Sequence, residues 1–159
     1  EHLIKLGRRR ILFVGPSDLP QIDLRLEGYK TALQEHGLLI ADELIIDAQF
    51  TGNSAYEQVA LALHKGLNFD AIFAASDGIA VSALRALEGA GKNCPRDVSV
   101  VGFDDSELAV QARPPLTTIR QDVAGIAFEI VRLLFKRLEG VGTDSVAVPV
   151  ELVVRESAP

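Results

Sequence analysis

The chain has 159 residues, of which 48% are hydrophobic and 24% are charged, and its formal net charge is −6. These values are typical of one globular domain, and they argue against a broad basic face for nucleic acid, since Arg8–Arg10 is the only basic run. We expect those arginines to be solvated at a corner between a helix and a strand. Cys94 is the only cysteine, so no disulfide can form within the chain, and no apolar run approaches the ~20 residues of a membrane span.

Short apolar segments alternate with segments of helical periodicity along the first part of the chain. Fully apolar strands need helices on both faces, so this alternation predicts an α/β fold with a doubly wound parallel sheet. Thr51 to Ser54 offers caps for one helix, and Asp77 is expected to cap the next one, which Gly91 ends. The predicted strands comprise residues 11–14, 44–46, 71–74 and 98–102, and the predicted helices residues 22–33, 54–67 and 78–90.

The pattern changes after Pro114-Pro115. Residues 117–120 are expected to be extended, and the alternation of apolar residues over 146–154 predicts a final strand. Between them, residues 122–139 predict a helix with an apolar stripe, and so large a stripe is expected to be removed from water. The stripe consists of Val123, Ile126, Ile130, Leu134 and Leu138.

Ligands of open α/β sheets bind beyond the carboxyl ends of the strands, and this rule selects candidate residues. Carboxylates, two serines and a phenyl ring follow the predicted strands, and an arginine of the first long helix can reach the same rim. Carboxylates and guanidinium groups bind hydroxyls, while a phenyl face covers the C–H side of a sugar or the plane of a base. The residues selected are Ser17, Asp18, Phe50, Ser76, Asp77, Asp104 and Asp105, together with Arg25.

Each candidate also has a structural interpretation. Asp77 is equally well explained as a helix cap, Phe50 as a core residue and Arg25 as a partner in a surface ion pair. Asp104 and Asp105 also fit a turn. The functional interpretation depends on their convergence at one rim.

The sequence shows no pattern typical of a catalytic site. Its serines lack the pattern of a nucleophile elbow, and its histidines fall away from the rim on predicted helix ends or faces. Cys94 lacks a basic neighbour that would activate it. We therefore expect no catalytic residue, no metal site and no cofactor, and an α/β enzyme remains a remote alternative.

Five segments together carry a resemblance to a known family. They are residues 2–11 (HLIKLGRRRI), 25–29 (RLEGY), 97–105 (DVSVVGFDD), 114–121 (PPLTTIRQ) and 151–157 (ELVVRES). The chain resembles the effector-binding domain of lactose-repressor/galactose-repressor family transcriptional regulators over essentially its whole length. A periplasmic sugar-binding protein of a transporter is the alternative, but the last two segments resemble the repressors.

The resemblance implies a two-lobed, periplasmic-binding-protein-like domain in a cytoplasmic DNA-binding regulator. Residues 1–119 and 149–159 would form the C-terminal lobe, and residues 120–148 would cross to an N-terminal lobe absent from this chain. The DNA-binding helix-turn-helix is likewise absent, so operator DNA would be bound only through that missing part, and no membrane partner is expected.

The resemblance implies that five of these candidates contact a sugar, polyol or nucleoside effector, namely Arg25, Phe50, Ser76, Asp77 and Asp104. Ser76 stands where sugar-binding members often have asparagine. The resemblance also implies a homodimer, whose interface residues would be Ile79, Val81, Leu108, Val110 and Ala112.

Overall fold

The computed structural model describes residues 1–50, 53–142 and 144–159. This part of the chain forms one six-stranded sheet in the order β2-β1-β3-β4-β5-β6. The first five strands are parallel, and β6 is antiparallel to β5. The strands are β1 Ile11–Gly15, β2 Ile45–Asp47, β3 Ala71–Ala74, β4 Ser99–Asp104, β5 Thr117–Gln121 and β6 Val150–Val153.

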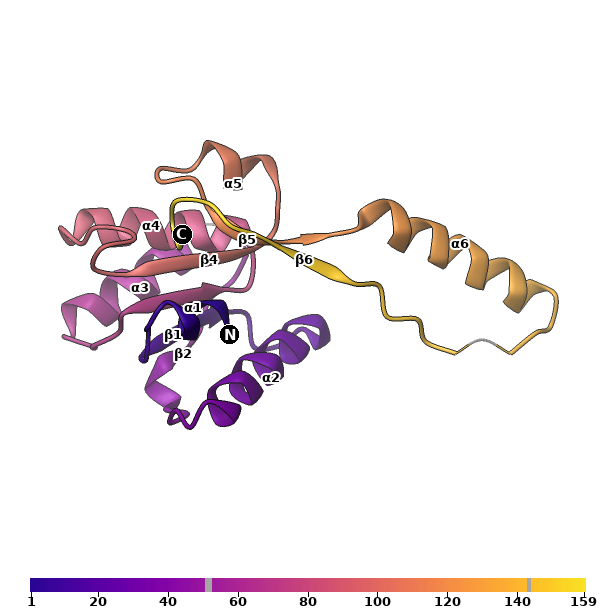
Figure 1. The fold of residues 1–159 in the computed structure, drawn as a ribbon, viewed down its shortest axis with the longest axis horizontal. Coiled ribbons are helices and arrows are strands. Elements are labelled where there is room, and N and C mark those ends of the chain that lie inside the picture. The colour runs from indigo at the N-terminus through magenta and orange to yellow at the C-terminus, as the bar shows by residue number, and fades with distance from the viewer. Residues whose placement is uncertain (51–52, 143) are drawn as a thin grey trace.

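Helices lie on both faces of the sheet (Figure 1). Residues along β4 show the two faces, because Gly102 lies against Ala80 of α4 while its neighbours Val101 and Phe103 face a groove beside α1 and α2. The predicted doubly wound α/β fold is therefore confirmed, with one antiparallel strand that the sequence did not indicate. The helices are α1 His2–Lys5, α2 Pro20–Glu35, α3 Ser54–His64, α4 Asp77–Gly89, α5 Glu107–Gln111 and α6 Val123–Leu138, with a 3-10 turn over Asp42–Leu44.

Several predicted boundaries shift in the structure. Leu44 belongs to the 3-10 turn, and the second strand begins at Ile45, where pairing with β1 begins. The last strand begins only at Val150 because that residue pairs with Gln121, the final residue of β5. Residues 146–149 therefore have no neighbouring strand to pair with. Thr51, named among the possible caps of α3, lies outside the described residues.

The sequence suggested that Arg8–Arg10 are solvated, but the structure shows that they bond to other parts of the protein. The Arg8 guanidinium donates to Ser99 Oγ at 3.1 Å and to the Pro95 carbonyl at 2.5 Å. The backbone N–H groups of Arg9 and Arg10 donate to the Asp70 carboxylate. This run therefore joins the amino ends of β1, β3 and β4, which is a structural role.

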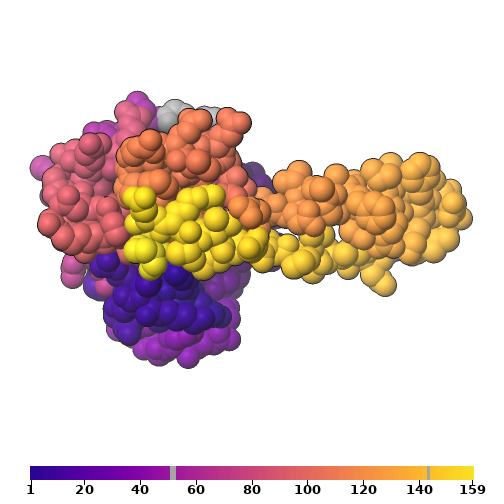
Figure 2. Space-filling model, turned by 45° about the horizontal axis from the view of Figure 1, so that its top comes forward, coloured from indigo at the N-terminus to yellow at the C-terminus, as the bar shows by residue number. Residues whose placement is uncertain are grey.

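The helix α6 projects away from the body of the molecule on two extended connections (Figure 1). It begins as predicted, with Asp122 Oδ1 accepting a hydrogen bond from Gly125 N at 2.9 Å. None of its residues, all of which the structure describes, is buried. Four of the five residues of its apolar stripe, all except Ile126, have more than half of their surface exposed in this chain, and the space-filling view shows this segment standing apart from the body (Figure 2). In the described part, no helix is long and apolar enough to cross a membrane.

The glycine that ends β1 generates a prediction about packing. A Cβ atom at Gly15 would lie 2.5 Å from Ala75 Cβ and 3.2 Å from Ile22 Cγ2, and both neighbours are buried. We expect Gly15→Ala to lower the free energy of unfolding by ~1–3 kcal/mol through overpacking. Gly28→Ala is the control because its Cβ would meet nothing within 4 Å. It should raise stability by ~0.5–1 kcal/mol in the middle of α2. Urea denaturation measures both, and equal effects would contradict this account.

Candidate functional site

The guanidinium of Arg25 lies at the centre of the rim formed by the carboxyl ends of the strands. From α2 it donates a hydrogen bond to the Ala75 carbonyl, just beyond β3. Its Cζ atom is 3.6 Å from the centroid of the Phe103 ring, which is a cation–π geometry. Its Nη2 atom is 4.0 Å from Asp104 Oδ1 at the end of β4. Residues from three elements thus converge on one point.

The charges of Arg25 and Asp104 are poorly compensated by one another. Burial lowers the pKa of Arg25, and the nearby Asp104 carboxylate only partly opposes that shift. Burial also raises the pKa of Asp104, against the effect of Arg25 and of a hydrogen bond from Gln121 Nε2 at 2.9 Å. A separation of 4.0 Å is too long for a direct hydrogen bond. Both groups therefore retain bonding capacity that a polar ligand can satisfy.

Asp77 and Ser76 lie at the same rim but are occupied by the protein itself. The Asp77 side chain accepts hydrogen bonds from Ser106 N at 2.7 Å, Ser106 Oγ at 2.9 Å and Thr118 Oγ1 at 2.6 Å. The residue is only 1% exposed. The predicted cap is also corrected, because Ser76 is the N-cap of α4 and accepts from Ile79 N at 3.3 Å. Asp77 is instead the first residue of the helix, and its carboxylate holds other elements in place.

Phe50 lies in the loop after β2, with 44% of its surface exposed, so it is not the core residue of the structural interpretation.

The residues expected at a dimer interface divide into two groups. Ile79 and Ala112 are buried in the lobe's own core and have little surface left for a partner, which corrects their assignment. Leu108 and Val110 are 48% and 57% exposed on α5, and Val81 is partly buried.

Four residues of the rim were not among the candidates. Phe103 supports Arg25, Gln121 bonds Asp104, and Ser106 and Thr118 bond Asp77. Side chains alternate between the two faces of a strand, so Phe103 lies on the face opposite Gly102. This placement of Phe103 could have been predicted from the sequence. The partners of Asp77 were not, because they lie 29 and 41 residues away along the chain.

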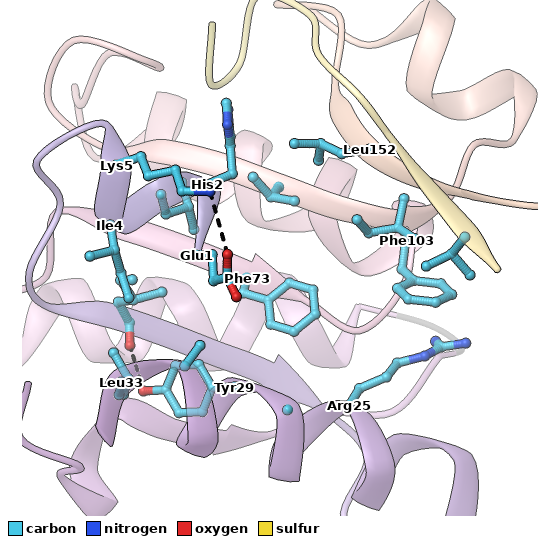
Figure 3. Close-up of a pocket in the computed structure, with 17 residues that line it drawn as sticks. Glu1, His2, Ile4, Lys5, Arg25, Tyr29, Leu33, Phe73, Phe103 and Leu152 are labelled. Atoms are coloured by element: carbon cyan, nitrogen blue, oxygen red, sulfur yellow. Dashed lines mark hydrogen bonds and ion pairs between the residues drawn. The ribbon is translucent and has the colours of Figure 1, made fainter. Parts of the chain in front are cut away.

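An apolar groove of about 490 Å³ begins beside this rim and runs between the sheet, α1 and α2 (Figure 3). Arg25 and Phe103 lie at one end, and Tyr29, Phe73 and Leu152 line its walls. Burial raises the pKa of the Cys94 thiol to about 11, so this cysteine is not an activated nucleophile. No cluster suited to a metal ion occurs within residues 1–50, 53–142 and 144–159.

Comparisons with known proteins agree with this architecture. A family model described as a periplasmic binding protein-like domain matches residues 1–158. The regulator CelR of Thermobifida fusca is 39% identical over 99% of this chain, and the regulator AscG of Escherichia coli is 37% identical over 87%. The chain spans 47% and 41% of those two proteins, so it corresponds to about half of each.

Solved structures give the same result. The complex of CelR with cellobiose superimposes with a TM-score of 0.90 at 39% identity, over 98% of this chain and 48% of that one. The lac repressor dimer bound to operator and an anti-inducer gives 0.91 at 31% identity, over 99% of this chain and 55% of that one.

The fold and its rim define one lobe of a periplasmic-binding-protein-like domain. Within that class, the chain belongs to the LacI family of transcriptional regulators, as part of the effector-binding domain. The resemblance noted in the sequence is thereby confirmed. The relatives are regulators and not enzymes, as the sequence predicted.

The hydrogen bonds of Asp77 generate a prediction that separates a structural role from ligand binding. Asp77→Asn replaces one acceptor oxygen with a donor that faces donors, so we expect a loss of about 1–3 kcal/mol in the free energy of unfolding without any ligand. Asp18→Asn, on the exposed part of the same rim, should change stability by less than ~0.5 kcal/mol. Chemical denaturation of both variants is the measurement. Unchanged stability of Asp77→Asn would contradict the structural role.

Proposed function

We propose that this chain is the effector-sensing lobe of a DNA-binding transcriptional repressor, with a sugar, polyol or nucleoside as effector. The observation that carries the proposal is the incomplete pairing of Arg25 and Asp104, which are partly buried yet 4.0 Å apart. Hydroxyl groups both donate and accept, so adjacent hydroxyls of one ligand can bond the carboxylate and the guanidinium together. Phe50 and Ser76 would complete the contacts, whereas Asp77 would act through the residues that it holds.

The relatives support a carbohydrate among these ligands. One solved relative is a complex with cellobiose, and another relative is called a ribose operon repressor. Ser76 offers a short hydroxyl that already caps α4, so the fit of a particular sugar would depend on the neighbouring side chains. The effector would bind in a cleft between this lobe and a second one, and its binding would shift the affinity for operator DNA.

The second lobe is proposed from the geometry of residues 120–148. This segment begins with the last two residues of β5, forms the exposed helix α6 and returns at Pro149 before β6. Each large apolar side chain of the stripe contributes roughly 1.5–3 kcal/mol when it is buried, so a stable arrangement covers the stripe. Arg120 and Gln121 still pair with neighbouring strands of this sheet. We therefore propose that residues 1–121 and 149–159 form one lobe, two residues more than the sequence indicated, and that residues 122–148 pack in the other. DNA contacts would belong to a separate helix-turn-helix, and the whole regulator would work in the cytoplasm.

A ligand screen tests the proposal directly. The panel consists of cellobiose, maltose, ribose, xylitol and adenosine, added to the full-length protein in thermal-shift assays. A ligand at about 100 times its dissociation constant should stabilise the protein by ~2.7 kcal/mol. For any ligand that does so, Arg25→Ala and Asp104→Ala should each weaken affinity at least tenfold, since losing one partner of a buried charged hydrogen bond costs ~2–5 kcal/mol.

Arg96→Ala is the matched control for this screen, because Arg96 is exposed and lies before the amino end of β4, opposite the rim formed by the carboxyl ends. It should bind like the unaltered protein in calorimetric titrations. Undiminished affinity in both the Arg25 and Asp104 variants would overturn the assignment of the site. A response to none of the sugars, polyols or nucleosides would argue against this effector class.

We further propose that the protein is a homodimer through a surface that includes Leu108, Val110 and Val81. The side chains of Leu108 and Val110 are exposed on α5 in the isolated chain. A two-fold contact would bury them on both protomers. Leu108→Asp combined with Val110→Asp should convert a dimer into a monomer in sedimentation experiments. Leu39→Asp, at a site 89% exposed between α2 and the 3-10 turn, should leave the dimer intact. A monomer before any substitution would contradict the proposal.

A further inference from the structure

We propose that Asp105 is a positioning residue that ties the effector-binding turn to the two connecting strands. Its Oδ2 atom accepts a hydrogen bond from Arg120 Nε of β5 at 2.6 Å. Its Oδ1 atom accepts one from Arg155 Nη2, just beyond β6, at 2.6 Å. One carboxylate thus holds the strand that leaves the lobe and the segment that returns to it. This inference rests on the proposed function, in which the preceding residue, Asp104, binds the effector.

Asp105, Arg120 and Arg155 form a clamp whose two ion pairs differ in burial. The inner pair, Asp105 with Arg155, is more buried than the outer pair, Asp105 with Arg120. The side chains of Asp105 and Arg155 are only 9% and 19% exposed. Arg155 also donates to the Leu116 carbonyl at 2.8 Å, so its guanidinium is fixed on two sides. Arg120 is 48% exposed, and its second partner, Glu151, is 70% exposed at 3.3 Å. The carboxylate of Asp105 is therefore the group on which the cluster depends, and Glu151 contributes little.

The clamp also explains an unusual backbone conformation. Asp104 and Asp105 have φ values of 113° and 54°, in the region that side-chain-bearing residues seldom adopt. Such conformations persist only where the surroundings hold them. The contacts that hold this turn include the clamp on Asp105, the hydrogen bond from Gln121 to Asp104 and the hydrogen bonds from Ser106 to Asp77. The first two come from the connecting strands, so these strands contribute to the position of the Asp104 carboxylate relative to Arg25.

A functional consequence follows from this connection. Any movement of the connecting strands relative to the lobe has to displace Arg120 or Arg155, and with them the turn that carries Asp104. Coupling of this kind is reciprocal, so a ligand held by Asp104 would in turn favour one position of the strands. The burial of Asp105 opposes its charge, but hydrogen bonds from Arg155 and Arg120 keep its pKa below the ordinary value. The clamp is therefore charged and complete at neutral pH.

Hydrogen exchange in the ligand-free, full-length protein tests the clamp. Asp105→Asn keeps a side chain that tolerates positive φ while it removes the charge. We expect protection factors of residues 104–106, 117–121 and 150–155 to fall at least tenfold, with β1 and β3 unchanged. Glu151→Gln is the control and should change them less than twofold. A uniform loss across the sheet, or no loss at residues 104–106, would overturn the proposal.

A pH series and a milder variant complete the test. The stability difference between the unaltered protein and Asp105→Asn should persist from neutral pH downward and disappear only below the ordinary pKa of an aspartate, because the folded-state pKa is lowered. A difference independent of pH would contradict a charge-based clamp. If Asp105→Asn fails to fold, Arg120→Gln removes only the outer partner and should loosen the same segments to a smaller extent. Loosening elsewhere would overturn the proposal. No effector is used, so this outcome is independent of the proposed function.

Discussion

The arrangement of the rim depends on one buried carboxylate, that of Asp77. It lies at the first residue of α4, packs against Gly102 of β4, and bonds Ser106 at the start of α5 and Thr118 on β5. A carboxylate that loses its water must be fully bonded within the protein, and this one satisfies that condition with three donors. Four elements are consequently held in one relative position. The turn that carries Asp104 lies between two of them.

The contrast between Asp77 and Asp104 explains how one rim can be both rigid and able to bind. Asp77 is saturated by the protein, so it contributes stability and geometry. Asp104 has a single close partner, Gln121, and an arginine at 4.0 Å. It is therefore the carboxylate with capacity for a ligand. The partners of Asp105 extend the same rim toward the connecting strands. Stability, binding and the route to the rest of the protein thus reside in three different carboxylates.

The local and periodic features of this protein follow from its amino-acid sequence alone. Apolar segments of strand length, separated by helical stripes, require a sheet covered on both faces, and the sheet is indeed doubly wound. The amphipathic period of residues 122–139 predicted α6 within one residue at each end. Parallel strands place their carboxyl ends together, so Arg25 and Asp104 could be expected at one rim before any coordinates. These features depend on neighbours in sequence or on a general rule of sheet geometry.

The pairing of the polar groups depends on the complete fold, because the partners are distant in sequence and several donors compete for each carboxylate. Asp77 was an equally good cap or ligand residue until Ser76 was found to cap α4 and Thr118 to occupy Asp77. Ile79 was a plausible surface residue until the core enclosed it. The antiparallel return of β6 was equally invisible, because alternation of side chains is the same in either strand direction. The register of Arg120 and Arg155 around Asp105 follows from that return, and no local pattern encodes it.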